Sequence, residues 1–279
     1  MEWAYAFASV TGTAHARLGL PCQDACRCQV VRAADGDDVL IAVVSDGAGS
    51  ASRAEVGSQL ACAQWLDRTT SLLARPGGHR LFSRDWAYNW LEQFQREVQL
   101  RADEENLSPR DFACTILGAV IGPDYTVFVQ VGDGCIVVSP RDEPNEYCWI
   151  FWPQQGEYEN TTIFTTDPRA LQCFYFEFDS RYVDEVALFT DGLQRLALNI
   201  ASQTVHGPFF RPMFEALAGE GTGYLEQRSR QLAAFLDSQQ VNDRVDDDKT
   251  LVLATRRLCI GVKDDTFGDG SQINTPNPV

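Results

Sequence analysis

The sequence predicts a single domain of the α+β class, in which pairs of helices cover β-sheets. Two long helical patterns follow one another early in the chain, and short apolar runs typical of strands dominate its middle. The chain is 279 residues long and 44% hydrophobic, which is enough for a sizeable core, and no repeat or clear linker divides it. We expect one domain over 1–262 and a disordered tail over 263–279, rich in Asp, Gly, Asn and Pro.

The first half of the chain combines three strands with two helices. A helix is expected over 53–73, with its stop at Pro76-Gly77-Gly78. Ser83 can cap a second long helix, in which apolar side chains recur every four residues from Trp86 to Val98 and indicate core packing. The strands are expected at 2–11, 26–31 and 39–45.

The second half is richer in strands. A hairpin is expected around Gly122-Pro123-Asp124, and two further helices are expected later, over 212–218 and 224–237. The strands are expected at 113–121, 125–131, 135–139, 147–152, 161–165, 173–178, 186–190 and 250–255.

The formal net charge of -16 and the sequence pI near 4.5 limit the partners of the protein. This charge disfavours binding to nucleic acid or to an anionic membrane, and it suits a protein that concentrates cations. No stretch approaches the roughly 18–20 apolar residues of a membrane span. The start of the chain lacks the features of a signal peptide, so we expect a cytoplasmic protein.

The nine cysteines are odd in number and show no repeated two-residue spacing. Cys22, Cys26 and Cys28 resemble part of a zinc site, but no matching Cys or His pair follows at the required separation. Most of the others lie in apolar segments, where a free cysteine packs as a small hydrophobe. We therefore expect reduced thiols, as in a reducing compartment.

An apolar run over 39–44 ends in Ser45 and Asp46, followed by the small residues Gly47-Ala48-Gly49. Its length suits a strand buried on both faces. A carboxylate at the end of such a strand is costly unless it is paired or bound to a cation. The glycines leave the backbone bare beside Asp46, so a carbonyl group or a ligand can approach. This stretch is predicted to form half of a metal site.

Similar junctions recur along the chain, since an apolar strand meets a carboxylate at five widely separated places. They are Gln23-Asp24, Asp46-Gly47, Gly132-Asp133-Gly134, Asp191-Gly192 and Asp246-Asp247-Asp248. Carboxylates brought together would repel one another unless divalent cations neutralised them. Ligation by oxygen alone favours Mg²⁺ or Mn²⁺ over zinc, and two such ions could clamp a phosphoryl oxygen and polarise a shared water. With only three histidines, a His-based triad is hard to build.

The order of these motifs, together with Ala113-Cys114-Thr115 and Lys249-Thr250, resembles the metal-dependent protein phosphatase 2C family over roughly residues 5 to 256. The opening 9–15, with Pro21-Cys22-Gln23-Asp24, is similar to its stand-alone bacterial branch. The resemblance implies a four-layer α-β-β-α sandwich: two antiparallel sheets between pairs of helices, with the metals at one edge of the sheets.

The resemblance also implies roles for single residues. Asp46 would bridge two metals, with the Gly47 carbonyl completing one of them, and Asp191 and Asp247 would bind the first. Asp24 would lie beside the second metal, and Asp133 would join Asp191 at a weaker third site. Asp248 stands where the family often has asparagine, and is a candidate for an indirect role or for a ligand.

Three positions depart from the family pattern. Gly19 stands in place of the phosphate-binding arginine, and Ala48 in place of the acidic histidine that some members carry. Arg17 and His15 are the candidate substitutes, with His15 or metal-bound water protonating the leaving group. Arg195 replaces an aspartate of the third site, which weakens the expectation of a third metal.

We therefore predict a Mg²⁺- or Mn²⁺-dependent phosphatase that hydrolyses phosphoserine and phosphothreonine in proteins, by attack of a metal-bridging hydroxide. Its expected partners are phosphoprotein substrates of a serine/threonine kinase, and the expected state is a monomer. Two alternatives stay open. One is a degenerate module that binds phosphoprotein or a kinase without turnover. The other is a metal phosphodiesterase acting on a nucleotide, although no base-binding signature is evident.

Overall fold

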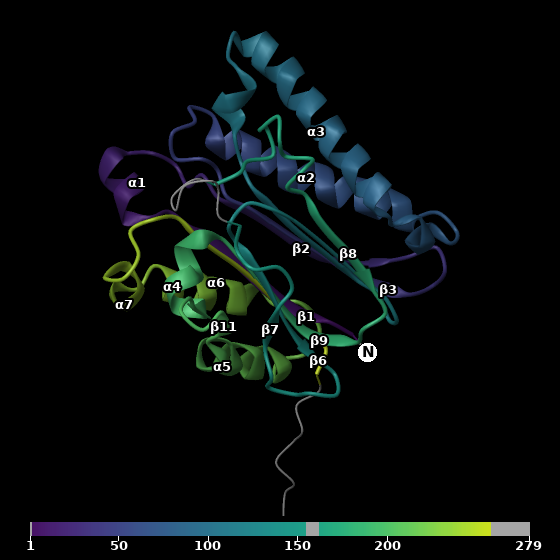
Figure 1. The fold of residues 1–279 in the computed structure, drawn as a ribbon. Helices are drawn as coiled ribbons and strands as arrows, with labels where there is room; N and C mark the ends of the chain where they lie inside the picture. The colour runs from purple at the N-terminus through teal and green to yellow at the C-terminus, as the bar shows by residue number, and fades with distance from the viewer. Residues whose placement is uncertain (1, 155–161, 258–279) are drawn as a thin grey trace, which may run out of the picture.

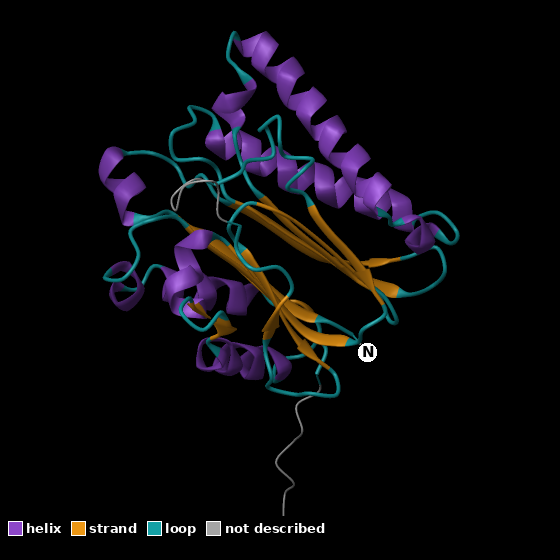
Figure 2. Ribbon diagram, in the orientation of Figure 1, coloured by secondary structure: helices purple, strands orange, loops and turns teal. Residues whose placement is uncertain are grey.

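The computed structural model describes residues 2–154 and 162–257, which fold into four layers. Two β-sheets lie face to face in the middle, and helices cover the outer face of each sheet (Figures 1 and 2). This is the helix–sheet–sheet–helix arrangement that the sequence resemblance implies.

The first sheet has five strands in the order β2-β3-β4-β5-β8, and every neighbouring pair is antiparallel. Its outer face is covered by α2 (Ala54–Leu73) and α3 (Arg84–Glu105) (Figure 1). The hydroxyl of Ser83 accepts a hydrogen bond from the Trp86 N–H at 3.2 Å, which confirms the predicted cap of α3. The strands are β2 (Ala25–Arg32), β3 (Asp38–Ser45), β4 (Ile116–Ile121), β5 (Thr126–Val131) and β8 (Tyr175–Asp179).

The second sheet has six strands in the order β12-β1-β13-β9-β6-β7. It is antiparallel except for its edge pair, since β12 runs parallel to β1. Its outer face packs against α5 (Gly207–Ala218) and α6 (Glu226–Leu236). The strands are β1 (Ala4–Val10), β6 (Cys135–Pro140), β7 (Cys148–Trp149), β9 (Val183–Phe189), β12 (Gly223–Tyr224) and β13 (Lys249–Thr255).

Short elements connect the layers, and the sequence pattern did not indicate them because few of their residues face the core. They are α1 (Thr13–Leu18), α4 (Gln194–Ala197), α7 (Gln239–Asn242), β10 (Leu198–Asn199), β11 (Thr204–Val205), η1 (Gly78–Leu81), η2 (Pro109–Phe112) and η3 (Asp191–Leu193).

Three apolar clusters hold the layers together. The cluster between the sheets is built from alternate side chains of β3, β4, β9 and β13, such as Leu40, Leu117, Leu188 and Val252. Two further clusters join each sheet to its own helices. Because both faces of the central strands are buried, the strand sequences are continuously apolar, and a polar residue at the end of a strand stands out.

Four sequence predictions need correction. The strand predicted over 113–121 begins only at Ile116, because the backbones of Ala113 and Thr115 bond instead to the loop around Asp46. The strand predicted over 147–152 is reduced to β7, and the described part of 161–165 is not a strand. Helix α5 begins five residues before the predicted start, since Pro208 fits its first turn and Phe210 reaches the core.

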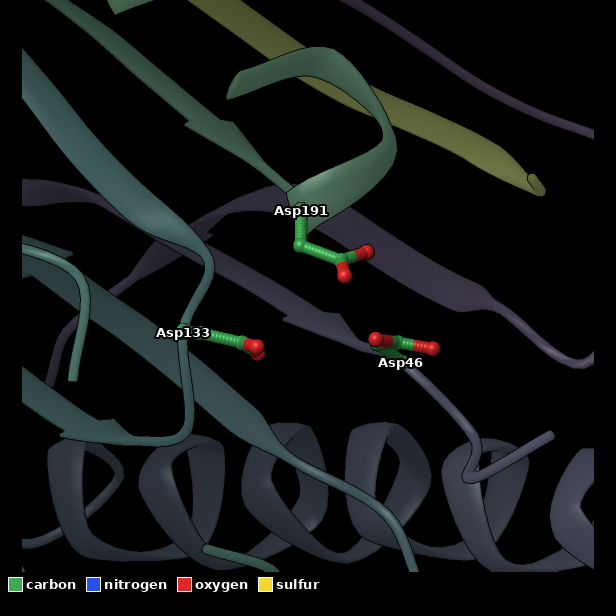
Figure 3. A group of neighbouring side chains, drawn as sticks. All are labelled: Asp46, Asp133 and Asp191. Atoms are coloured by element: carbon green, nitrogen blue, oxygen red, sulfur yellow. The ribbon is translucent and has the colours of Figure 1, made fainter. Parts of the chain in front are cut away.

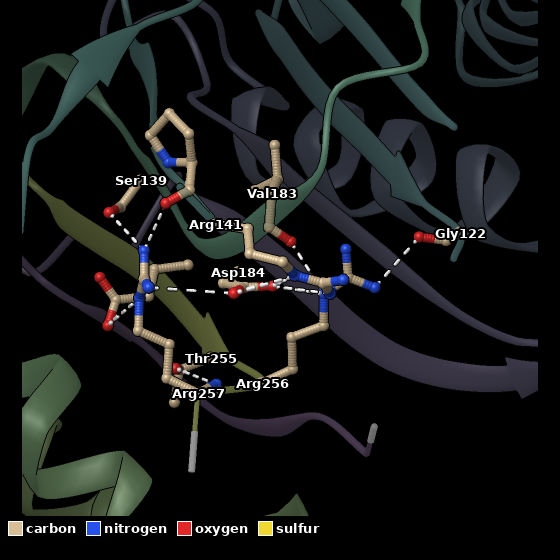
Figure 4. A network of polar contacts seen from close by, with 10 residues as sticks. Gly122, Ser139, Arg141, Val183, Asp184, Thr255, Arg256 and Arg257 are labelled. Carbon is tan, nitrogen blue, oxygen red and sulfur yellow. Dashed lines mark hydrogen bonds and ion pairs between the residues drawn. The ribbon is translucent and has the colours of Figure 1, made fainter. Parts of the chain in front are cut away.

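At one end of the sandwich, Asp184 near the start of β9 is surrounded by three guanidinium groups (Figure 4). Arg141 and Arg256 approach its Oδ1 at 3.1 Å, and Arg257 approaches its Oδ2 at 3.8 Å. Arg256 also donates to the Gly122 carbonyl at 3.2 Å, which joins the six-stranded sheet to the β4–β5 turn of the other sheet. We call this the arginine end.

The cysteine prediction is confirmed for the described residues, where all eight cysteines are free. Burial raises the pKa of the thiols of Cys28, Cys62 and Cys114. Cys259 and the predicted tail over 263–279 lie outside the described residues. Among the described helices, none is long and apolar enough to cross a membrane.

Candidate metal centre

At the other end of the sandwich, which we call the aspartate end, three carboxylates converge (Figure 3). Asp46 follows β3, Asp133 lies in the turn between β5 and β6, and Asp191 follows β9. One oxygen of each side chain lies within 4.8 Å of an oxygen of the other two. Both sheets therefore contribute to the same group, although the three residues are far apart in the sequence.

A fourth carboxylate, Asp24, is buried beside this group, directly before β2. Its Oδ2 accepts a hydrogen bond from the hydroxyl of Thr190 at 2.8 Å. Its Oδ1 is buried and has no hydrogen-bond partner among the described residues, and the same holds for Oδ1 of Asp133. Buried oxygens of this kind are rarely left without a partner in native proteins.

The electrostatics of the aspartate end are unfavourable without a cation. Burial, followed by the charges of Asp24 and Asp191, raises the pKa of Asp46 well above its usual range. Burial also raises the pKa of Asp24 to about 7, and burial together with Asp133 raises that of Asp191 to about 7. Burial raises the pKa of Asp133 as well. Within the described chain, no ion pair with Lys, Arg or His reaches these four carboxylates.

Asp247 and Gly47 lie at the border of this group. Asp247 is exposed and outside the set of three, but its charge raises the pKa of Asp46, so it lies nearby. The Asp247 backbone is held close, since a Cβ on Gly12 would lie 2.2 Å from its carbonyl carbon. Gly47 is buried, and a Cβ there would lie 2.6 Å from the Gln23 carbonyl oxygen. Both glycines are therefore required by the close approach of backbone segments.

Asp248 connects three segments of the chain. Its Oδ1 accepts the Gly12 N–H and its Oδ2 accepts the Gln23 N–H, each at 2.6 Å. The same Oδ2 lies 3.0 Å from Nδ1 of His15 in α1. Asp248 thus holds α1 and the approach to Asp24 in place, and its two oxygens already have partners.

Arg17 and Arg195 are not brought to the carboxylates. Arg17 is exposed on α1, where its guanidinium lies 3.4 Å from the hydroxyl of Thr13 and borders a hollow beside α7. Arg195 is exposed on α4. Neither contacts the aspartate group in the described part of the chain.

The sequence did not reveal which side chains hydrogen-bond to the aspartates and hold them in place. The hydroxyl of Thr162 donates to Oδ2 of Asp133 at 2.5 Å, and the Gln194 side chain donates to the Asp133 carbonyl at 2.6 Å. The hydroxyl of Thr115 accepts the Asp46 N–H at 2.9 Å. The threonine next to the acid in Thr190-Asp191 could have indicated a hydrogen-bond partner for a carboxylate. The sequence alone does not show where its hydroxyl points.

The residues fit a hard divalent cation. The donors are all carboxylate oxygens, which Mg²⁺ and Mn²⁺ prefer, and two buried oxygens lack partners among the described residues. Like charges at this spacing require a counter-charge, and no side chain of the described chain supplies one.

Comparison with known proteins agrees with this arrangement. Residues 11–237 match the family described as Protein phosphatase 2C. The chain is 38% identical to Serine/threonine-protein phosphatase 3 of Escherichia coli (strain K12) over 254 residues, which is 91% of this chain and 98% of that protein.

Solved structures show the same fold at low sequence identity. The catalytic domain of the serine threonine protein phosphatase PstP, in complex with two manganese ions, has a TM-score of 0.59 and 16% identity, covering 91% of this chain and 98% of that one. The S. agalactiae serine/threonine phosphatase has a TM-score of 0.61 and 15% identity, covering 91% and 99%. By family match, identity and fold, this chain belongs to the protein phosphatase 2C family.

Proposed function

We propose that this member of the protein phosphatase 2C family is a metal-dependent phosphatase that hydrolyses phosphoserine and phosphothreonine in proteins. The family match and the relative named as a serine/threonine phosphatase support the substrate class. One observation carries the metal dependence: Asp24, Asp46, Asp133 and Asp191 converge at one end of the two sheets with no protein cation of the described chain among them.

The residues divide among two cations and a weaker third. Asp46, Asp191, Asp247 and the Gly47 carbonyl would hold the first Mn²⁺ or Mg²⁺, and Asp46 with Asp24 the second. Asp133 and Asp191 would hold the third. When bound, these ions supply charge neutralisation for the phosphoryl oxygens and an activated water for in-line attack.

Protonation of the leaving group and binding of the phosphate require side chains other than the aspartates. Ala48 leaves the loop after Asp46 without an acid, and His15 is the candidate acid, since its Nδ1 lies 3.0 Å from Oδ2 of the buried Asp248. We propose that His15 donates the proton to the leaving alkoxide. Since Arg17 contacts Thr13 on exposed surface, we assign it no phosphate contact. Asp248 is proposed to orient His15 and the backbone before Asp24 rather than to bind metal.

The proposed activity also indicates the substrates and the location of the protein. We propose phosphoprotein substrates made by a serine/threonine kinase, a cytoplasmic location and a monomeric state. The free cysteines among the described residues agree with a reducing compartment. We further propose that residues 1–262 form the catalytic domain and that 263–279 lie outside it.

A phosphothreonine peptide and Mn²⁺ test the proposal directly. Wild-type protein should release phosphate, whereas Asp46→Asn and Asp191→Asn should not. Asp124→Asn, an exposed turn residue, is the matched control and should retain full activity. No turnover by folded wild-type protein with any divalent metal would contradict the proposal. It would favour the second candidate, a non-catalytic phosphoprotein-binding module, which Gly19, Ala48 and Arg195 motivate.

A further inference from the structure

Thr190 lies between β9 and Asp191, and only 1% of its surface is exposed. Its hydroxyl donates to Oδ2 of Asp24 at 2.8 Å and accepts the N–H of Thr250 at 3.1 Å. Donor and acceptor capacity are thus both used, so the direction of the hydroxyl is fixed.

These contacts cross from one sheet to the other. Asp24 immediately precedes β2 of the five-stranded sheet, whereas Thr190 directly follows β9 and Thr250 lies in β13 of the six-stranded sheet. The Thr190 hydroxyl therefore joins a carboxylate of one layer to the backbone of the other. The apolar contacts between the sheets have no such directionality.

Asp24 needs this support because its surroundings are repulsive. It is buried, and the charge of Asp248 acts on it, whereas the hydrogen bond from Thr190 favours its charged form. With Oδ2 held by Thr190, Oδ1 is the oxygen left without a partner among the described residues. Thr190 therefore holds Oδ2 of Asp24, and Oδ1 of the same carboxylate is available to a ligand.

We propose that Thr190 is a positioning residue for cation binding, whose hydroxyl holds Asp24 so that its Oδ1 can ligate the second divalent cation. The inference rests on the proposed function, and it concerns a residue that would not touch the metal. Partners that orient a ligand commonly change metal affinity by about 10–100-fold when they are removed.

The test uses the full chain, stripped of metal, and measures Mn²⁺ binding by calorimetry and by the electron paramagnetic resonance of free Mn²⁺. Thr190→Val keeps the shape and removes the hydroxyl, and it should weaken one Mn²⁺ ion by about tenfold or more. Thr190→Ser restores the hydroxyl and should bind within about threefold of wild type. Thr69→Val is the matched control, because Thr69 is buried in α2 and its hydroxyl has no partner among the described residues.

A double-mutant cycle with Asp24→Ala separates positioning from a general effect on folding. If Thr190 acts through Asp24, Thr190→Val should change Mn²⁺ affinity no further in the Asp24→Ala background. Additive losses, or Thr190→Ser binding as weakly as Thr190→Val, would overturn the inference. If Thr190→Val does not fold, Thr190→Ala takes its place in the cycle. Wild-type protein that binds no Mn²⁺ would instead contradict the proposed function itself.

Discussion

Two aspartates at opposite ends of β9 have opposite surroundings. Asp184, near the start of β9, is buried among Arg141, Arg256 and Arg257. Asp191, just after the end of β9, is near Asp46 and Asp133, and no ion pair reaches it within the described chain. At the arginine end the protein supplies its own counter-charge. At the aspartate end it does not, so a cation from solution is the missing partner.

The comparison implies that the same substitution should have different consequences at the two ends. Removing a carboxylate from the arginine end should damage stability and spare chemistry. Removing one from the aspartate end should damage chemistry and spare the stability of the metal-free protein.

Asp46→Asn should lower kcat/KM for a phosphothreonine peptide by at least about a thousandfold, which corresponds to about 4 kcal/mol of barrier. Asp46 lies at the centre of the aspartate group, and its amide analogue lacks the negative charge that a cation requires. Steady-state kinetics in saturating Mn²⁺ measures the effect, with Asp124→Asn as control. A decrease in kcat/KM of less than about tenfold would show that Asp46 is not the ligand shared by the two cations.

Asp184→Ala should lower the free energy of unfolding by about 3–5 kcal/mol, because the buried guanidinium group of Arg256 loses its counter-charge. Urea denaturation at constant metal concentration gives the value. Activity per folded molecule should stay near that of wild type, since the residue lies at the end of β9 away from Asp191. Lost activity with unchanged stability would reverse the contrast between the two ends.

Mn²⁺ should stabilise the metal-free wild-type protein by about 2.7 kcal/mol at a concentration of one hundred times its dissociation constant. Thermal unfolding with and without a chelator measures this shift. Asp46→Asn should show almost no shift, and its metal-free form should be at least as stable as wild type, since one repulsive charge is gone. An equal Mn²⁺ shift in the variant would indicate that the ion binds elsewhere.

The smallest effect is the dependence of metal-free stability on pH. The pKa values of Asp24 and Asp191 are raised to about 7, so the folded state keeps protons that the unfolded state has released. This contribution is complete below pH 4 and is lost as pH rises to about 7, by on the order of 1 kcal/mol per pH unit. The charge of Asp248 also raises the pKa of Asp24, whereas a hydrogen bond with Asp46 lowers it. The charges of Asp133, Asp247 and Asp24 raise the pKa of Asp191.

Urea denaturation between pH 5 and pH 8 tests this dependence. Saturating Mn²⁺ should abolish or reverse the decline, because cation binding requires the deprotonated carboxylates. If the metal-free protein became more stable from pH 5 to pH 7, the carboxylates of the aspartate end would not be protonated in the folded, metal-free state as proposed.

The continuous apolar runs determined most of the fold. The run over 39–45 and the helical pattern after Ser83 correspond to β3 and α3 with small shifts of their ends. The short elements were missed because each spans only two to six residues, too few for a periodic pattern to show. The strand predicted over 161–165 is wrong for its described part, 162–165, where Thr162 donates to Asp133 instead of pairing in a sheet.

The sequence alone shows that carboxylates follow several buried strands and that their order resembles a two-metal phosphatase site. A carboxylate after an apolar run is visible locally, and five such junctions are visible in order. The folded chain adds that Asp133 lies with Asp46 and Asp191, that Asp247 lies outside this set of three, and that the exposed Arg17 contacts Thr13. The physical reason is that hydrogen bonds between distant segments set side-chain direction. Thr190 directly follows β9 of one sheet and Asp24 directly precedes β2 of the other, so they meet only when the two sheets pack together.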